Sequence, residues 1–131
     1  MRLLLDTHIW IWSLTDPARL KPKIRAALTH RNAELWLSSI SVWEALVLIR
    51  KGRLQVTDSH ASRWIGEALK RSPLREAPLT HAIAIESQLL EVDYRDPADR
   101  FIAATARILD ATLVTADERL ISARTLKVLP S

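Results

Sequence analysis

The sequence of 131 residues contains no cysteine. This absence excludes a disulfide framework, a thiolate zinc site and a cysteine nucleophile. A chain without cysteine suits a reducing compartment, and we expect a cytoplasmic protein.

Long hydrophobic runs are also missing. The apolar stretch Leu3–Leu5 ends at Asp6, and the stretch Ile9–Leu14 is soon followed by Asp16 and Pro17. Neither is long enough for a membrane span, and neither has the form of a signal peptide. The sequence therefore predicts a soluble protein without a membrane partner.

Glycine is scarce, with two residues, and the six prolines are scattered. The chain shows no linker, low-complexity tract or repeat. Its length lies within the usual range for one domain and is enough to bury a core without disulfides. We expect a single domain over residues 1–131.

The excess of positive charge is small. Lys and Arg number 19 against 15 Asp and Glu, which gives a formal charge of +4. This charge favours polyanions weakly, and an ordinary solvated basic surface explains it equally well.

Short apolar strands alternate with helices along the sequence. The predicted strands are 3–5, 35–37, 74–77, 112–115 and 126–129. The predicted helices are 7–14, 42–51, 63–71, 80–90, one that begins at Pro97 and carries Ile108, and a short one from Asp117. Ser41 is the expected N-cap of the second helix, with Glu44 completing a capping box. This pattern predicts an α/β fold with a central parallel sheet, right-handed crossovers and helices on both faces.

Four acidic residues stand where predicted strands lead into helices. Asp6 follows the first strand directly, and Asp117 comes two residues after Thr115. Glu44 and Asp99 lie in the first turns of two predicted helices. Because ligand sites of parallel sheets form at the carboxyl edge, we expect these carboxylates to converge there.

Each acid alone has an ordinary explanation, since a carboxylate at a helix start contributes about 0.3 to 1 kcal/mol. The group of four is different, because two carboxylates about 4 Å apart repel by roughly 4 kcal/mol at an intermediate dielectric. Proton uptake or a bound divalent cation would relieve this repulsion. A donor set of oxygens favours Mg²⁺ or Mn²⁺ over zinc, without choosing between the two.

Four motifs resemble those of PIN-domain ribonucleases, and most closely of VapC toxins from toxin–antitoxin pairs. The motifs are Leu4-Leu5-Asp6-Thr7-His8, Ser41-Val42-Trp43-Glu44, Asp96-Pro97-Ala98-Asp99-Arg100 and Leu113-Val114-Thr115-Ala116-Asp117. No single motif is specific, but their order and spacing are, and the resemblance spans essentially the whole chain.

The resemblance implies a PIN-like fold and a metal-dependent endoribonuclease that hydrolyses RNA with a metal-activated water. The implied metal-binding and catalytic residues are Asp6, Glu44, Asp99 and Asp117. Thr7 and Thr115 would orient carboxylates or a water through their hydroxyls, and Asp117 is either a further ligand or a base that positions water. A homodimer and a cognate antitoxin are implied partners.

Two positions depart from the family pattern, because this chain has Tyr94 and Ala98 where many relatives carry His and Phe. Neither position supplies a metal ligand, so local packing and substrate contacts are the properties affected. Asp96 either joins the outer shell of the acidic site or caps the helix that begins at Pro97, and capping is the favoured interpretation.

Arg50, Lys51 and Arg53 form a basic group after the Glu44 helix, and these residues are candidates for RNA phosphate contacts. For any one of them, an ordinary solvated charge is the simpler explanation. His8 is expected to make a local hydrogen bond.

Two other function classes remain open. An aspartyl phosphotransferase would use Asp6 as nucleophile. Such sites commonly carry a second acid two residues later, where this chain has His8, and Lys23 is the only lysine within the early helices. A non-catalytic RNA-binding or regulatory module would keep the acids for structure.

Overall fold

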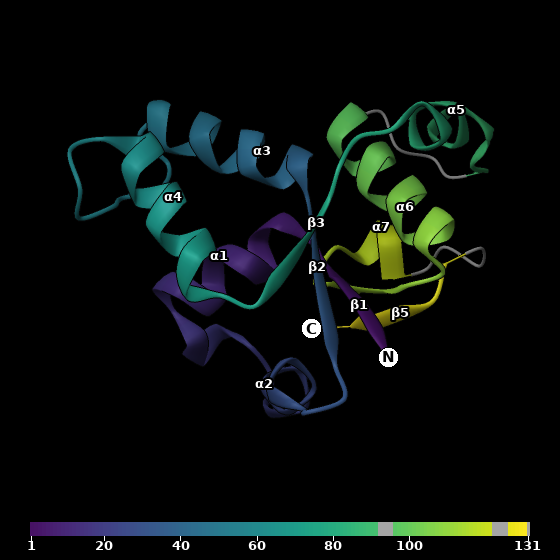
Figure 1. Cartoon of the computed structure of the whole chain (residues 1–131), viewed down its shortest axis with the longest axis horizontal. Coiled ribbons are helices and arrows are strands. Elements are labelled where there is room, and N and C mark those ends of the chain that lie inside the picture. Colours follow the sequence, from purple (N-terminus) through teal and green to yellow (C-terminus); the bar gives the residue numbers. More distant parts are fainter. Residues whose placement is uncertain (92–95, 122–125, 131) are drawn as a thin grey trace.

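The computed structural model describes residues 1–91, 96–121 and 126–130. Five parallel strands form one sheet in the order β3-β2-β1-β4-β5 (Figure 1). The strands are β1 (Arg2–Leu5), β2 (Glu34–Ser38), β3 (Leu74–Ala77), β4 (Thr112–Thr115) and β5 (Val128–Pro130). The predicted α/β fold with a central parallel sheet is confirmed.

Helices cover both faces of this sheet (Figure 1). The helices are α1 (Thr7–Thr15), α2 (Pro22–Thr29), α3 (Ser39–Arg50), α4 (Ala61–Arg71), α5 (His81–Leu89), α6 (Pro97–Leu109) and α7 (Glu118–Ile121), with a 3-10 turn η1 (Pro17–Arg19). Helices α1 to α4 pack on one face, whereas α5 to α7 pack on the other. The sheet is therefore the middle of three layers.

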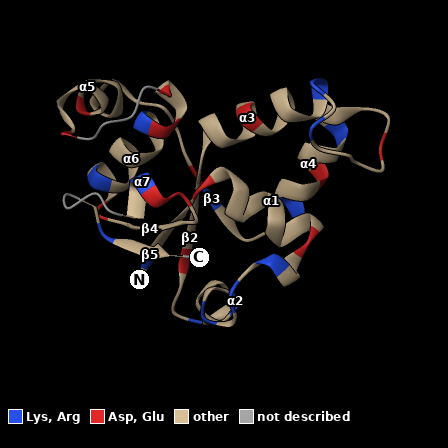
Figure 2. Cartoon of the chain, turned by 180° about the vertical axis from the view of Figure 1, so that it is seen from behind, with Lys and Arg blue, Asp and Glu red and all other residues tan. Residues whose placement is uncertain are grey.

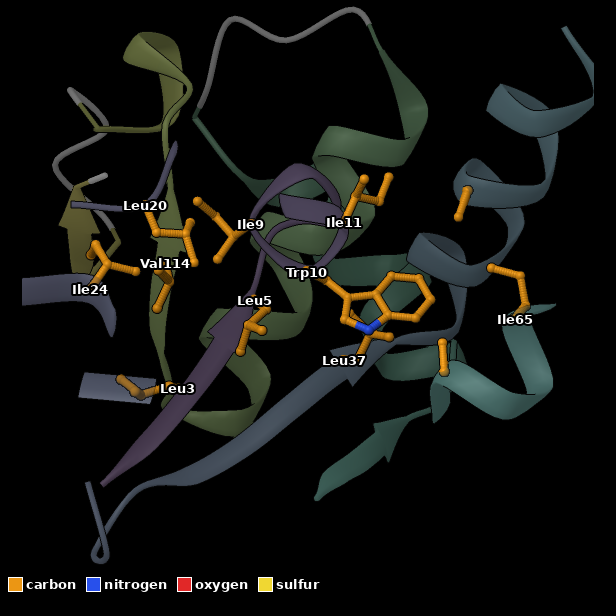
Figure 3. Close-up of a cluster of buried hydrophobic side chains, with 12 residues drawn as sticks. Leu3, Leu5, Ile9, Trp10, Ile11, Leu20, Ile24, Leu37, Ile65 and Val114 are labelled. Atoms are coloured by element: carbon orange, nitrogen blue, oxygen red, sulfur yellow. The ribbon is translucent and has the colours of Figure 1, made fainter. Parts of the chain in front are cut away.

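The first strand shows how the two cores are divided. Leu3 and Leu5 point into the core beneath α1 to α4, where Ile9 and Trp10 meet them (Figure 3). Leu4 points the opposite way, into the core beneath α5 to α7. All three leucines are buried because alternate residues of a strand face opposite sides of the sheet.

Some predicted element boundaries were wrong. Helix α3 begins at Ser39, and its N-cap is Ser38, whose hydroxyl accepts a hydrogen bond from the Ile40 N–H. Ser41 therefore lies inside the helix, and Glu44 does not complete a capping box. The last strand begins at Val128, two residues later than predicted.

Helix α2 and the turn η1 were not predicted. Pro22 stands in the first turn of α2, where its missing N–H costs nothing. Only Ile24 of this short helix is buried, so the sequence carries little apolar periodicity over it.

No helix in the parts of the chain that the structure describes is both long and apolar enough to cross a membrane.

The two isoleucines of α6 allow a matched test of the core. Ile102 is fully buried, whereas Ile108 is 46% exposed. Ile102→Ala should lower the free energy of unfolding by about 2 to 5 kcal/mol, because it leaves a cavity between α6 and the sheet. Ile108→Ala should change it by no more than about 0.5 kcal/mol. Urea unfolding measures both, and equal losses would contradict the assignment of this helix face.

Candidate active site

The sheet order reverses between β1 and β4, and both strands end at the same edge. Leu5 of β1 is paired with Val114 of β4. Asp6 follows β1, and Asp117 follows β4 after one intervening residue. A reversal of strand order opens a crevice at the carboxyl edge of a parallel sheet, which is the usual place for a ligand.

Asp6 is fixed by its position between these strands. Its backbone N–H donates to the Val114 carbonyl at 2.9 Å. One carboxylate oxygen accepts from the Thr7 N–H at 2.9 Å, which caps α1, and the other accepts from the Thr115 hydroxyl at 2.6 Å. The side chain is buried and has one defined orientation.

Glu44 is held from α1, although it belongs to α3. The Thr7 hydroxyl donates to a Glu44 carboxylate oxygen at 2.5 Å. The hydroxyls of Thr7 and Ser41 lie 2.9 Å apart in a buried hydrogen bond. Ser41 thus supports Thr7 from within α3, a contact that sequence reasoning missed when it assigned Ser41 as a cap.

Asp99 and Asp117 share a guanidinium that sequence reasoning also missed. Arg119 Nη2 lies 2.8 Å from an Asp117 oxygen and 3.0 Å from an Asp99 oxygen. Arg119 also donates to Asp117 through its backbone N–H at 2.9 Å. The only available signal was its place two residues after Asp117.

These groups line one pocket of about 420 Å³. Five acidic residues line it together with the cation Arg119. The acids are Asp6, Glu44, Asp96, Asp99 and Asp117. Figure 2 shows red segments between α7 and α1, where this pocket lies. The acids come from four separate parts of the chain, since Asp96 and Asp99 both stand at the start of α6, and the sheet edge brings these parts together.

Burial and mutual repulsion disfavour the charged forms of three carboxylates. Burial raises the pKa of Asp6 and of Glu44, outweighing the hydrogen bonds from Thr115 and Thr7. Burial and the neighbouring acids, chiefly Asp96, raise the pKa of Asp99 from 3.8 to about 7. By contrast, Arg119 lowers the pKa of Asp117.

The other predicted residues divide between this pocket and its surroundings. Asp96 lines the pocket and also caps α6, accepting from the Ala98 N–H at 2.9 Å. Ala98 is buried in the first turn of α6, and Tyr94 lies outside the described residues. Asp96 therefore has the capping contact that was favoured from sequence.

The basic group after α3 does not reach the acidic pocket. Arg50 and Lys51 are exposed at the end of α3, and Arg53 lines a neighbouring cavity. His8 has no side-chain hydrogen bond to any described residue, so the predicted local bond was wrong. Its ring packs against Trp12 instead, with 6.0 Å between ring centroids.

The donor chemistry fits a hard divalent cation, since the pocket offers carboxylate oxygens whose charge is poorly compensated. Within the described residues, however, no three acidic or histidine side chains are close enough to hold a metal ion as they stand. Arg119 occupies two carboxylates of the set. Cation binding would require Asp99 and Asp117 to exchange Arg119 for the ion.

The raised pKa of Asp99 predicts a pH-dependent stability in EDTA. The folded protein holds the proton of Asp99 more tightly than the unfolded chain does, so this contribution is present below about pH 4 and is lost as the pH rises through about 7. Asp99→Asn removes the titration. Relative to wild type, this variant should gain stability as the pH rises from about 5 to 7, and the difference should stay constant above that, as measured by urea unfolding.

Asp110→Asn is the control for this profile. Lys127 lowers the pKa of Asp110, so Asp110 is already ionised throughout that range. The free energy of unfolding of this variant should therefore change with pH in the same way as that of wild type. A stability difference between Asp99→Asn and wild type that does not vary with pH would contradict the raised pKa.

Comparisons with known proteins agree with this architecture. The PIN domain family model matches residues 3–126. The chain is 33% identical over 123 residues to Ribonuclease VapC22 of Mycobacterium tuberculosis (strain ATCC 25618 / H37Rv), covering 93% of this chain and 92% of that protein.

Solved structures have the same fold at low sequence identity. VapBC from Salmonella typhimurium bound to DNA matches with a TM-score of 0.74 and 15% identity, covering 99% of this chain and 98% of that chain. VapBC2 from Rickettsia felis bound to a promoter DNA fragment matches with a TM-score of 0.73 and 18% identity, covering 99% of this chain and 98% of that chain. The chain therefore belongs to the PIN-domain family, and its relatives there include VapC proteins.

Proposed function

We propose that this protein is a metal-dependent endoribonuclease and the toxin of a toxin–antitoxin pair. The observation that carries the proposal is the single pocket lined by Asp6, Glu44, Asp99 and Asp117 at the reversal of strand order. The relationship to Ribonuclease VapC22 supports RNA as the substrate.

The four acids are the proposed ligands of Mg²⁺, with Mn²⁺ as a substitute. A bound divalent cation would activate water for attack on a phosphodiester and neutralise negative charge on the phosphate. No protein nucleophile is required. In this proposal the acids bind the metal, and the remaining polar groups of the pocket hold the acids in position.

Two threonines keep the acids ready for this role. The Thr115 hydroxyl donates to Asp6 and also accepts from the Asp117 N–H at 3.0 Å. Thr7 holds Glu44 from α1. These bonds fix the carboxylate orientations before any ligand arrives, which lowers the cost of ordering the site on binding.

An aspartyl phosphotransferase has less support. Both oxygens of Asp6 already accept hydrogen bonds, and among the described residues no lysine lines the pocket to bind a transferred phosphate. The non-catalytic RNA-binding module differs from the proposal only in lacking cleavage, so an activity assay separates them.

An antitoxin and a second copy of the chain are the proposed protein partners. The structural neighbours named above are VapBC proteins, and another is described as a toxin–antitoxin complex from Klebsiella pneumoniae. An antitoxin segment over the acidic pocket would block access of RNA.

Asp6→Asn tests the catalytic proposal. The variant keeps the size of the side chain, removes its charge and replaces one of its two accepting oxygens with an NH2 group, and RNA cleavage should fall by at least about a hundredfold. The assay is cleavage of mixed cellular RNA in Mg²⁺, Mn²⁺ or EDTA by purified protein free of antitoxin. EDTA should abolish cleavage by the wild type.

Asp110→Asn makes the same chemical change on the surface and should cleave normally. Full activity of Asp6→Asn would remove Asp6 from the mechanism. A folded wild-type protein that cleaves no RNA with either metal would favour the non-catalytic module.

Arg119→Gln tests whether the guanidinium competes with the cation. Without Arg119, Asp99 and Asp117 are free to take a metal, and the Kd for Mn²⁺ should tighten by about two- to tenfold, given the modest strength of exposed ion pairs. Isothermal titration calorimetry measures this. Arg107→Gln breaks a surface pair with Glu86 and should leave Kd unchanged. Weaker binding by Arg119→Gln would mean that Arg119 organises the ligands instead.

A further inference from the structure

A second cavity of about 570 Å³ adjoins the acidic pocket. His8 and Trp12 line both cavities, so the two lie next to each other along α1. Arg19 and Arg53 bring positive charge to the second cavity, and Asp16 is its one acid among the described residues. The molecule therefore has neighbouring cavities of opposite electrostatic character.

The two guanidiniums are available to an anion. Neither Arg19 nor Arg53 forms an ion pair with any described carboxylate, and both side chains are exposed. Arg53 follows α3, and Figure 2 shows blue segments where α3 ends and the chain turns away from it. Arg19 reaches the same cavity from η1.

The wall between the two cavities is aromatic. Arg19 Cζ lies 4.2 Å from the Trp12 ring centroid, and His8 packs on the same tryptophan. The guanidinium therefore lies over the indole ring, and both aromatic rings and guanidinium planes are surfaces on which unpaired RNA bases stack.

RNA needs a binding surface outside the acidic pocket. The five carboxylates repel the phosphates of an RNA strand, and the one guanidinium offsets only part of this repulsion, so affinity for the strand has to come from outside the pocket. The cavity with two arginines is next to it. A protein segment could also lie there, but the paired arginines and the stacked aromatic wall favour a phosphate chain with unpaired bases.

We propose that the cavity lined by Trp12, Arg19 and Arg53 is the subsite for single-stranded RNA next to the cleavage position. Arg19 and Arg53 contact phosphates, and a base stacks on the Trp12–Arg19–His8 surface. This inference rests on the proposed ribonuclease function, and it replaces Arg50 and Lys51 with Arg19 as the partner of Arg53.

The test compares two double variants with equal loss of charge. Arg19→Gln/Arg53→Gln alters the cavity, whereas Arg25→Gln/Arg31→Gln removes two exposed arginines at and after α2. Binding of a fluorescein-labelled single-stranded RNA is measured by anisotropy in EDTA over a range of salt concentrations. Cleavage of the same RNA is measured with Mn²⁺, and thermal unfolding verifies that each variant is folded.

The cavity variant should bind RNA at least about tenfold more weakly, and the slope of log K against log salt should fall by about 0.7 for each lost phosphate contact. KM for cleavage should rise with little change in kcat. The control should stay within about twofold of wild type. Arg19→Lys/Arg53→Lys, which keeps the charges but not the planar guanidinium groups, should recover part of the affinity.

Equal binding and cleavage by the cavity and control variants would overturn the subsite and leave the cavity to a protein partner such as an antitoxin segment. A wild-type protein that binds RNA but does not cleave it would refute the ribonuclease proposal alone, because the binding comparison would still assess the subsite. A wild type that does neither would refute both.

Discussion

Repulsion among carboxylates at the carboxyl edge of the sheet is the constraint on which the site depends. Asp6, Glu44, Asp96, Asp99 and Asp117 line one pocket, and burial raises the pKa of three of them. The surrounding polar groups counter this cost: two threonine hydroxyls donate to carboxylates, and Arg119 bridges two acids. A site that is costly for folding yet supported on every side is typical of a functional site.

The sheet makes this arrangement possible because its central strands are held in place by packing on both faces. Strands β1 and β4 are neighbours, and their leucines and Val114 are buried against helices on both faces. Asp6 is fixed to these strands by the hydrogen bond from its backbone N–H to Val114 and by the hydrogen bond that its side chain accepts from Thr115. Glu44 is less directly placed, since it depends on the contact of α3 with Thr7. The position of Glu44 therefore depends on the packing of α3 against α1.

The sequence predicts the parts that follow from the parallel sheet and misses those that follow from local geometry. Asp6 and Asp117 stand after apolar strands, and the carboxyl ends of parallel strands must meet, so their proximity was predictable. Ser41 was assigned as a cap because Ser41 and Glu44 have the spacing of a capping box, whereas β2 ends at Ser38 and this residue caps α3. The Arg119 contact depends on the turn into α7, for which the sequence carries no periodic signal.

The division of charge along α1 connects the fold to the proposed chemistry. Asp6, at the start of the helix, belongs to the acidic pocket proposed to bind cations, whereas Arg19, just beyond its end, belongs to the cavity proposed to bind phosphate. Trp12 lies between them and lines both. In the proposed nuclease, the two ends of this short helix would thus serve two different requirements. The acids would bind the cation, and the arginines would bind the RNA substrate that the acids alone repel. Either cavity alone would hold one reactant, and their shared wall is what would bring both to the same phosphodiester.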